Sequence, residues 1–274
     1  MHTVKKAIIP VAGWGARWLP ITKTIEKCML PIGNRPIIDY VVQDCIAAGI
    51  TEIIFVVGET STQLENYYRS NIKLNDYLKR TNNHDKLSLV APLKGITFHY
   101  VVQPSYGKYG TAIPVALAAE YVATDESVVV IMGDDMFYGA ESEVKHLIEQ
   151  TPEGQSGILG AVLAADDKYS GMYGSIEVDE YDNLIRVSEH PDVVPKPFIK
   201  NVSTYLLNPT FLSAVRRYAE SPSASTGEYY IFTPFEELLA SGETMKLVRA
   251  EGMYLDGGSV QGWLHANRVV LGDI

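Results

Sequence analysis

The amino-acid sequence predicts an α/β protein whose mixed, mostly parallel sheet is flanked by helices. Short apolar segments rich in β-branched residues alternate along the chain with segments whose apolar residues recur at helical spacing. This alternation is typical of a parallel sheet that is covered on both faces. The 274 residues, 46% of them apolar, are enough for a sizeable core, and the chain has no internal repeat and no low-complexity linker.

The first half of the chain is predicted to hold four strands and three helices. Ala7–Val11 is a short apolar run and forms the first strand. Pro36 begins a helix that runs to about Ala48, and Gly49 ends it. The other strands of this half are predicted at residues 53–57, 97–102 and 127–132, and the other helices at residues 62–68 and 111–122. Residues 70–95 form a polar insertion with a weak helical core rather than a separate domain.

The second half is predicted to add five strands and three helices. The strands are expected at residues 158–164, 175–178, 184–188, 202–207 and 245–248, and the helices at residues 209–218, 233–239 and 260–270. A turn at residues 180–183 joins two of these strands. In open sheets of this kind ligands bind beyond the carboxyl ends of the strands. The places to search are therefore the loops that follow Val11, Val102, Met132, Ser188 and Tyr254.

Composition argues against several classes of protein. The formal net charge of −10 argues against a nucleic-acid-binding surface, which needs a positive footprint. No apolar stretch reaches the roughly 18 residues of a membrane helix, and the run that follows Lys6 is too short for the core of a signal peptide. Cys28 and Cys45 could form at most one disulfide, so a reduced cytoplasmic protein is the simpler interpretation.

The loop after the first strand has the composition of a phosphate-binding turn. Gly13 and Gly15 allow close approach of a phosphate to the backbone, and Arg17 and Lys27 add positive charge. A tight strand-to-loop turn with ordinary surface cations is the alternative interpretation. A dinucleotide-binding turn is disfavoured, because Trp18 stands where that motif needs its third glycine.

Two further segments carry polar side chains at predicted strand ends. The amide of Gln103 can donate and accept hydrogen bonds in one plane, which suits a pyrimidine edge, although an exposed glutamine before a glycine turn would look the same. Asp134 and Asp135 directly follow a buried strand. Mg²⁺ is commonly held by one or two carboxylates with phosphate oxygens and water, so this pair predicts a metal site, with a capping aspartate as the alternative.

The segment from Ala12 to Pro31 resembles the signature A-G-x-G-T-R-x-L-P-x-T-K-x-x-P-K-E-M-L-P of the sugar nucleotidyltransferases, most closely the bacterial UTP–glucose-1-phosphate uridylyltransferases. The matching residues are Ala12, Gly13, Gly15, Arg17, Leu19, Pro20, Thr22, Lys23, Lys27, Met29, Leu30 and Pro31. The segment departs from the signature at Ala16, Glu26 and Cys28. The resemblance implies a Rossmann-like nucleotide-diphospho-sugar transferase fold, with residues 1–274 as one domain, about 1–135 nucleotide-binding and about 136–274 sugar-binding.

The resemblance also implies a role for particular residues. The residues implied to bind the nucleotide are Ala12, Gly13, Gly15, Gln103 and Gly110. The residues implied to act in catalysis are Arg17 and Lys27, and those implied to hold Mg²⁺ are Asp134 and Asp256. The residues implied to bind the sugar phosphate are Gly174, Glu189 and His190. His190 replaces the lysine of the family's E-K-P element. We expect either that His190 contacts the phosphate and favours activity at lower pH, or that Lys196 or Lys200 supplies the missing charge.

The activity that the resemblance implies is transfer of a uridylyl group from UTP to glucose 1-phosphate. The insertion that follows Tyr68 favours uracil, because shorter thymidylyltransferases for the same sugar lack it. Two alternatives remain open: the same chemistry with another base or sugar, and a non-catalytic nucleotide-sugar-binding relative, which the substitutions at Glu26, Cys28 and His190 would suit. We expect a homodimer or homotetramer that binds neither nucleic acid nor membrane.

Overall fold

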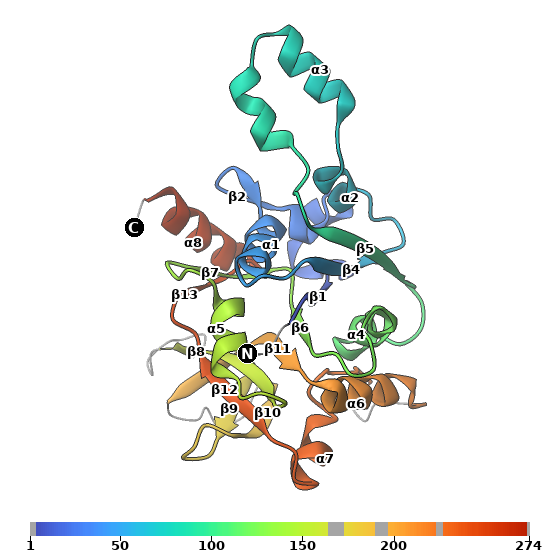
Figure 1. Ribbon diagram of the computed structural model, residues 1–274, viewed down its shortest axis with the longest axis vertical. Coiled ribbons are helices and arrows are strands. Elements are labelled where there is room, and N and C mark those ends of the chain that lie inside the picture. The colour runs from blue at the N-terminus through green and yellow to red at the C-terminus, as the bar shows by residue number, and fades with distance from the viewer. Residues whose placement is uncertain (1–3, 164–172, 190–196, 223–226, 273–274) are drawn as a thin grey trace.

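A nine-stranded sheet forms the centre of the molecule (Figure 1), with strand order β10-β9-β11-β6-β1-β4-β5 and with β8 joining β11 to β12. The computed structural model describes residues 4–163, 173–189, 197–222 and 227–272. The strands of this sheet are β1 (Lys6–Pro10), β4 (Glu52–Gly58), β5 (Thr97–Gln103), β6 (Val128–Ile131), β8 (Ser156–Leu163), β9 (Ser175–Val178), β10 (Leu184–Ser188), β11 (Phe198–Leu207) and β12 (Met245–Arg249).

The predicted mixed sheet flanked by helices is confirmed. The strands β6, β1, β4 and β5 run parallel, so their carboxyl ends meet at one edge. The long strand β11 is antiparallel to β6, β8 and β9, which makes the second half of the sheet mixed. This strand begins four residues before the predicted start, because the segment from Phe198 to Asn201 continues the pairing with β8 although Lys200 and Asn201 interrupt the apolar run.

Helices cover both faces of the sheet. They are α1 (Ile37–Ala47), α2 (Gln63–Tyr68), α3 (Ile72–Arg80), α4 (Ala112–Ala118), α5 (Glu143–Gln150), α6 (Pro209–Glu220), α7 (Phe235–Ala240) and α8 (Val260–Leu271). Alternate residues of β1 face opposite layers: Ile8 packs with α4, α6 and α7, whereas Ala7 and Ile9 pack with α1, α2 and α5. This alternation is the period of two that a strand imposes on its side chains.

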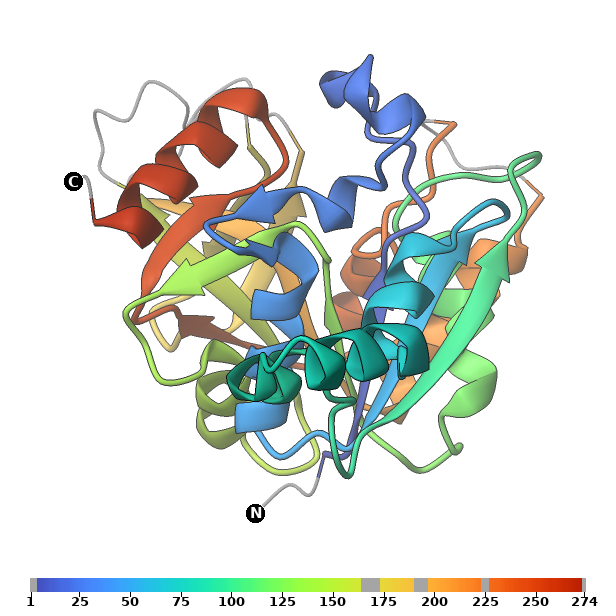
Figure 2. The ribbon, with the colours of Figure 1, turned by 90° about the horizontal axis from the view of Figure 1, so that it is seen from above.

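A third apolar cluster ties the loop after β1 to the end of the chain. Trp18 and Leu30 from that loop pack with Leu255 and with Ala266 of α8. Short 3-10 segments run through this and other loops: η1 (Ala16–Trp18), η2 (Ile21–Lys23), η3 (Lys27–Met29), η4 (His84–Val90) and η5 (Ala119–Tyr121). Figure 2 shows the segments η1 to η3 at the end of the sheet opposite the N-terminus. The loop is therefore packed against the C-terminal part of the chain.

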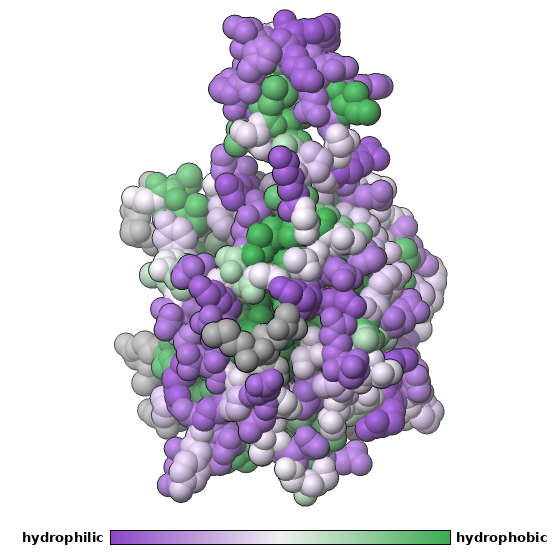
Figure 3. All heavy atoms as spheres, in the orientation of Figure 1, coloured by the Kyte–Doolittle hydropathy of each residue, from purple (hydrophilic) through white to green (hydrophobic). Residues whose placement is uncertain are grey.

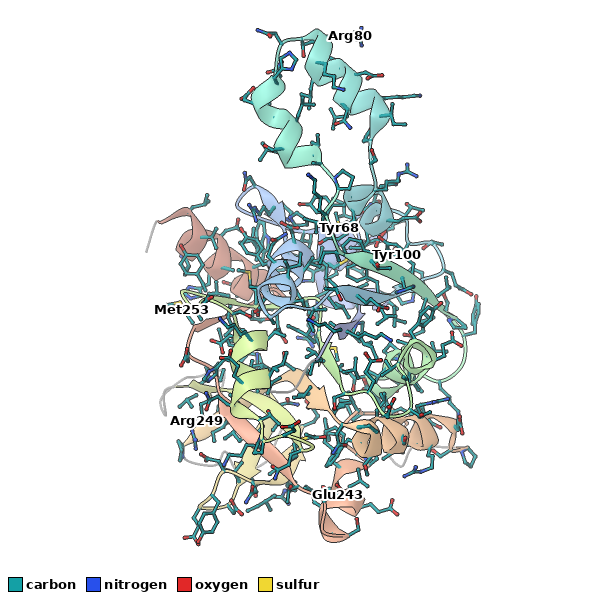
Figure 4. The ribbon with its side chains drawn as sticks, in the orientation of Figure 1. Tyr68, Arg80, Tyr100, Glu243, Arg249 and Met253 are labelled. Carbon is teal, nitrogen blue, oxygen red and sulfur yellow. The ribbon has the colours of Figure 1, made fainter. Side chains whose placement is uncertain are left out.

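The predicted insertion is an arm that projects from the body (Figure 1) and contains α3 and η4. The Asn71 side chain caps α3 by accepting a hydrogen bond of 3.0 Å from the backbone N–H of Leu74. Figure 4 shows Arg80 at the far end of the arm, with Tyr68 and Tyr100 at its base. The face of the arm in Figure 3 is largely hydrophilic, which agrees with the polar composition of the insertion.

Four short strands and one helix are new, and apart from Pro36, the predicted start of a helix, they lie where the sequence predicted neither strand nor helix. Two small antiparallel ribbons lie outside the main sheet, β2 (Pro31–Ile32) with β3 (Arg35–Pro36) and β7 (Asp135–Tyr138) with β13 (Met253–Asp256). The helix α5 follows β7, and its N-cap is Ser142, whose side chain accepts from the backbone N–H of Lys145 at 2.9 Å. In the described part of the chain, no helix is long and apolar enough to cross a membrane.

Candidate active site

A cavity of about 730 Å³ opens at the carboxyl edge of the parallel strands, where the loops that follow β1, β4, β5 and β6 meet. Its volume lies in the range of small-molecule sites. The predicted site residues that line it are Ala12, Gly13, Lys27, Gln103, Gly110 and Asp134. Gly15 and Arg17 do not line it, and Arg17 is exposed on η1. The edge predicted from the sheet topology therefore carries the cavity.

Gly15 gives the first loop its shape. Its φ of +62° is in the left-handed region, and a Cβ there would lie 3.0 Å from Thr22 Cγ2 and 3.2 Å from Lys27 Cβ. The Thr22 hydroxyl donates to the Gly15 carbonyl at 3.0 Å. At the other side, the Trp18 indole N–H donates to the carbonyl of Gly258 at 3.2 Å. These contacts hold Lys27 beside the segment that carries Asp256.

Asp134, Asp256 and Lys27 converge on Gly258. Lys27 Nζ donates to Asp134 Oδ2 in an ion pair whose two side chains are 23% and 28% exposed. A Cβ on Gly258 would lie 3.1 Å from Asp134 Oδ2, 2.9 Å from Asp256 Oδ1 and 3.4 Å from Lys27 Nζ. Since 3.1 and 2.9 Å are measured from one point, the two carboxylate oxygens are no more than 6.0 Å apart. Two acids that are 122 positions apart in the chain thus share one site.

The ribbon of β7 and β13 brings these acids together. Asp135 stands opposite Asp256 in its register, and the Gly257 N–H donates to the Asp134 carbonyl at 2.9 Å. A Cβ on Gly257 would lie 2.6 Å from that carbonyl oxygen, so only glycine permits the approach. The family resemblance implied that both acids share one site, but the sequence did not predict the pairing of β7 with β13, which depends on contacts between distant segments.

The carboxylate pair supplies oxygen ligands that a divalent metal ion can bind. Mg²⁺ is usually held by one or two protein carboxylates, with phosphate oxygens and water completing its shell. Asp256 Oδ1 accepts from the Gly258 N–H at 2.7 Å and Oδ2 from the Ser259 hydroxyl at 2.8 Å, which fixes the carboxylate while lone pairs remain. In the described residues, no group of three or more potential ligands forms an all-protein metal cage. The residues present therefore fit an ion that shares its ligands with a phosphate.

Glu26 is a structural anchor. Its Oε1 accepts from the backbone N–H groups of Thr62 and Gln63 at 2.9 and 2.8 Å, and its Oε2 accepts from the Ser61 hydroxyl at 2.7 Å. In return, the Glu26 N–H donates to Gln63 Oε1 at 3.0 Å. The carboxylate thus satisfies N–H groups at the start of α2. These contacts, here called the Glu26 clasp, join the loop of Lys27 to the loop that follows β4. They also satisfy the negative charge of the Glu26 carboxylate with hydrogen-bond donors.

The loop after β5 is fixed by two contacts with the C-terminal half. Lys108 Nζ donates to the carbonyls of Ala219 and Ser221 at 2.8 and 2.7 Å, at the end of α6, where the helix dipole favours a cation. Gly110 has φ of +116°, and a Cβ there would lie 2.5 Å from the backbone N and O of Tyr229. Gly110 is therefore required by the close approach of the segment around Tyr229, and Gln103 lines the cavity from the end of β5.

The predicted sugar-side residues Gly174 and Glu189 lie together. A Cβ on Gly174 would be 2.9 Å from Glu189 Oε1, and the Asn201 N–H donates to the Gly174 carbonyl at 2.8 Å. They do not line the cavity at the carboxyl edge of the parallel strands. His190 lies outside the described residues, as does Lys196. The described part of the predicted sugar site is thus assembled at the junction of β9, β10 and β11.

Lys200 and Asp135 occupy the space between these two groups. Lys200 on β11 is 4% exposed, and its Nζ lies 3.8 and 3.6 Å from the ring centroids of Tyr173 and Tyr254. The Tyr254 hydroxyl donates to Asp135 Oδ1. Burial raises the pKa of Asp135 to about 6, and the positive charge of Lys200 opposes the shift. The sequence presented Lys200 only as one of two lysines that could supply the charge missing at His190, because Lys200 precedes the predicted strand at residues 202–207.

The two cysteines are both free and buried. Burial raises the pKa of Cys28 and that of Cys45 above their ordinary range, so both thiols are held in the neutral form. Cys28 is 3% exposed and packs against the face of the sheet covered by α1. The substitution at this position therefore leaves a neutral thiol in the wall of the cavity.

Comparisons with known proteins span the same residues. A family model described as Nucleotidyl transferase matches residues 6–272. A Methanocaldococcus jannaschii protein provisionally named UTP–glucose-1-phosphate uridylyltransferase is 32% identical over 273 residues, covering 96% of this chain and 92% of that protein. The UTP–glucose-1-phosphate uridylyltransferase of Mycoplasma pneumoniae is 26% identical over 277 residues, covering 97% and 92%. A solved UDP-glucose pyrophosphorylase from Acinetobacter baumannii has a TM-score of 0.84 at 25% identity, covering 97% and 92%.

Proposed function

The chain belongs to the nucleotidyl transferase family, and on that premise we propose that it transfers a uridylyl group from UTP to glucose 1-phosphate, giving UDP-glucose and pyrophosphate. The names of both relatives and of the solved pyrophosphorylase support this choice of substrates. The observation that carries the proposal is the convergence of Asp134, Asp256 and Lys27 on Gly258, beside a cavity that Asp134 and Lys27 line.

The proposed reaction is an in-line displacement. A phosphate oxygen of glucose 1-phosphate forms a bond to the α-phosphorus of UTP, the bond from that phosphorus to the β-phosphate breaks, and pyrophosphate leaves. The nucleophile is already an anion, so the reaction needs no general base. Catalysis then rests on positioning and on stabilising negative charge. We assign the triphosphate to Gly13 and Lys27, which line the cavity, and to Gly15 and Arg17 of the same loop, which lie outside the cavity wall.

The remaining ligand groups are assigned on either side of this centre. Gln103 would bind the uracil edge, and Gly174 with Glu189 would bind glucose hydroxyls. Nucleotidyltransferases of this family generally use a divalent metal, and we propose that Asp134 and Asp256 hold Mg²⁺. When bound, Mg²⁺ supplies charge neutralisation at the phosphates. On the side that faces the cavity, the positive charge of Lys27 pairs with the negative charge of Asp134.

The test of the proposal compares UDP-glucose formation by wild type and by Asp134→Asn, and the release of pyrophosphate measures the rate. We expect the variant to lose turnover by about 100-fold or more, because removing one preorganised charge typically costs this much. Asp76→Asn, on the exposed arm, is the matched control and should keep wild-type turnover. Circular dichroism and thermal unfolding check that both variants fold. Wild-type turnover by a folded Asp134→Asn protein would contradict the site.

The choice of substrates is tested with a panel of UTP, dTTP and CTP against several hexose 1-phosphates. UTP with glucose 1-phosphate should give the highest kcat/KM. A wild-type protein that binds UDP-glucose in calorimetry but makes none would be the non-catalytic relative instead. We also propose that the protein acts as a cytoplasmic homodimer or homotetramer, and light scattering of the purified protein measures the oligomeric state.

A further inference from the structure

Lys200 is a buried amine for which the described residues provide no anionic partner at contact distance. It lies on β11 opposite Ser175 of β9 and Ala161 of β8, and it is 4% exposed. The ion pairs of the described residues do not include it. Lysine is rarely buried unless it is paired, because its charge loses hydration. A position of this kind calls for a function.

The surroundings of the amine are suited to a cation that receives an anionic ligand. The faces of Tyr173 and Tyr254, at 3.8 and 3.6 Å from Nζ, stabilise positive charge and offer no hydrogen-bond acceptor from their rings. Burial lowers the pKa of Lys200, and nearby carboxylates oppose that shift. These are Asp135, Asp256, Asp134 and Glu189, in decreasing order of effect. The amine thus senses both the acid pair and the sugar-side glutamate.

We propose that Lys200 Nζ binds the phosphate of the sugar phosphate and so determines affinity for that substrate. The inference rests on the proposed function. A hexose 1-phosphate in this site must turn its hydroxyls toward Gly174 and Glu189 and its phosphate toward Asp134 and Asp256. Lys200 lies at the boundary between these groups, whereas Lys27 is paired with Asp134 on the nucleotide side. An ammonium group has three donors, and a phosphate supplies acceptors for them.

The experiment compares wild type with Lys200→Met and with the matched control Lys6→Met. Methionine keeps an unbranched apolar stem in the buried position and removes the charge. Lys6 is also a partly buried lysine, with a side chain 16% exposed, but it lies at the amino end of β1 and pairs with Glu126. Calorimetry measures the dissociation constants of glucose 1-phosphate and of UTP separately. The glucose 1-phosphate titration is repeated in the presence of a UTP analogue whose α,β-bridging oxygen is replaced by methylene.

We expect Lys200→Met to weaken glucose 1-phosphate binding at least tenfold and to change UTP binding less than twofold. The control should change neither. Equal losses for both ligands would indicate a merely structural role and overturn the inference, as would unchanged glucose 1-phosphate affinity. Lys200→Gln, which keeps a polar head, gives the same comparison if the methionine variant does not fold.

The proposed activity and the role of Lys200 fail in different ways. A wild-type protein that binds glucose 1-phosphate without forming UDP-glucose contradicts the activity, while the loss of binding in Lys200→Met still supports the phosphate contact. A wild-type protein that does not bind glucose 1-phosphate, with or without the UTP analogue, overturns the assignment of Lys200. If Lys200→Met keeps its turnover with a raised KM for glucose 1-phosphate and an unchanged KM for UTP, the result supports both the activity and the role of Lys200.

Discussion

Replacing Glu26 should loosen the loop that presents Lys27. The Glu26 carboxylate accepts three hydrogen bonds of 2.7 to 2.9 Å, two from backbone N–H groups at the start of α2 and one from the Ser61 hydroxyl. Losing a helix-capping side chain costs about 0.5–2 kcal/mol, and hydrogen bonds to a charged group are worth about 1.5–3 kcal/mol each. The side chain is only half-buried and water replaces part of this, so we expect Glu26→Ala to lower the free energy of unfolding by about 2–3 kcal/mol.

Glu26→Gln separates the effect of charge from that of shape. The amide oxygen can still accept from the N–H groups of Thr62 and Gln63, so the expected loss is about 1 kcal/mol. Urea denaturation followed by circular dichroism gives both values. Glu65→Ala is the matched control, because Glu65 is an exposed glutamate on α2 and alanine is a good helix former.

The clasp also has a functional readout. Since Glu26 adjoins Lys27, a loosened loop should raise the KM for UTP in Glu26→Ala even at temperatures where the variant is folded. A Glu26→Ala protein that unfolds at the same urea concentration as Glu65→Ala would refute the reasoning. It would mean that water satisfies the start of α2 as well as the carboxylate does.

Three other predictions concern a glycine, a buried carboxyl group and the metal ion. Gly110→Ala should lower the free energy of unfolding by about 3 kcal/mol, because its Cβ would lie 2.5 Å from the Tyr229 backbone at a positive φ. Gly107→Ala, with a similar φ of +112° and no atom within 4 Å of its Cβ, should lose clearly less in the same urea titration. Burial raises the pKa of Asp44 above its ordinary value near 3.8, so the native state keeps this proton to higher pH than the unfolded chain. The unfolding free energy of wild type minus that of Asp44→Asn should therefore fall as pH rises above 3.8, and urea denaturation over a pH series measures it. Removal of divalent cations with EDTA should abolish pyrophosphate release, and added Mg²⁺ should restore it; full activity in EDTA would contradict the magnesium assignment.

Local pattern was sufficient for much of the site. The apolar run before Val11 and the β-branched run before Asp134 identified two neighbouring parallel strands, and their carboxyl ends do carry the cavity. A strand of this kind can be predicted from its own residues, because burial on both faces requires a continuous apolar segment. Asp134 was found at the end of such a segment, and Asp256 was found through a motif that resembles the family's.

Other parts of the site depend on which distant segments meet. Neither β7 nor β13 has an apolar pattern that distinguishes a strand from a loop, and each is ordered by pairing with the other across more than 100 residues. The same applies to Glu26, which the sequence could present only as an extra negative charge beside Lys27. Its partners at the start of α2 show that the charge caps backbone N–H groups.

The sequence alone determined the alternation of strands and helices and the sheet edge at which Asp134 lies, since both follow from periodicity and spacing within short segments, whereas Asp256 was identified through the family resemblance. Only the tertiary structure showed that the backbone of Tyr229 lies too close to Gly110 for any side chain there, and that Lys200 lies between the acid pair and Glu189. Such pairs come from segments far apart along the chain. Their proximity results from packing the whole core, and no local pattern of residues encodes it.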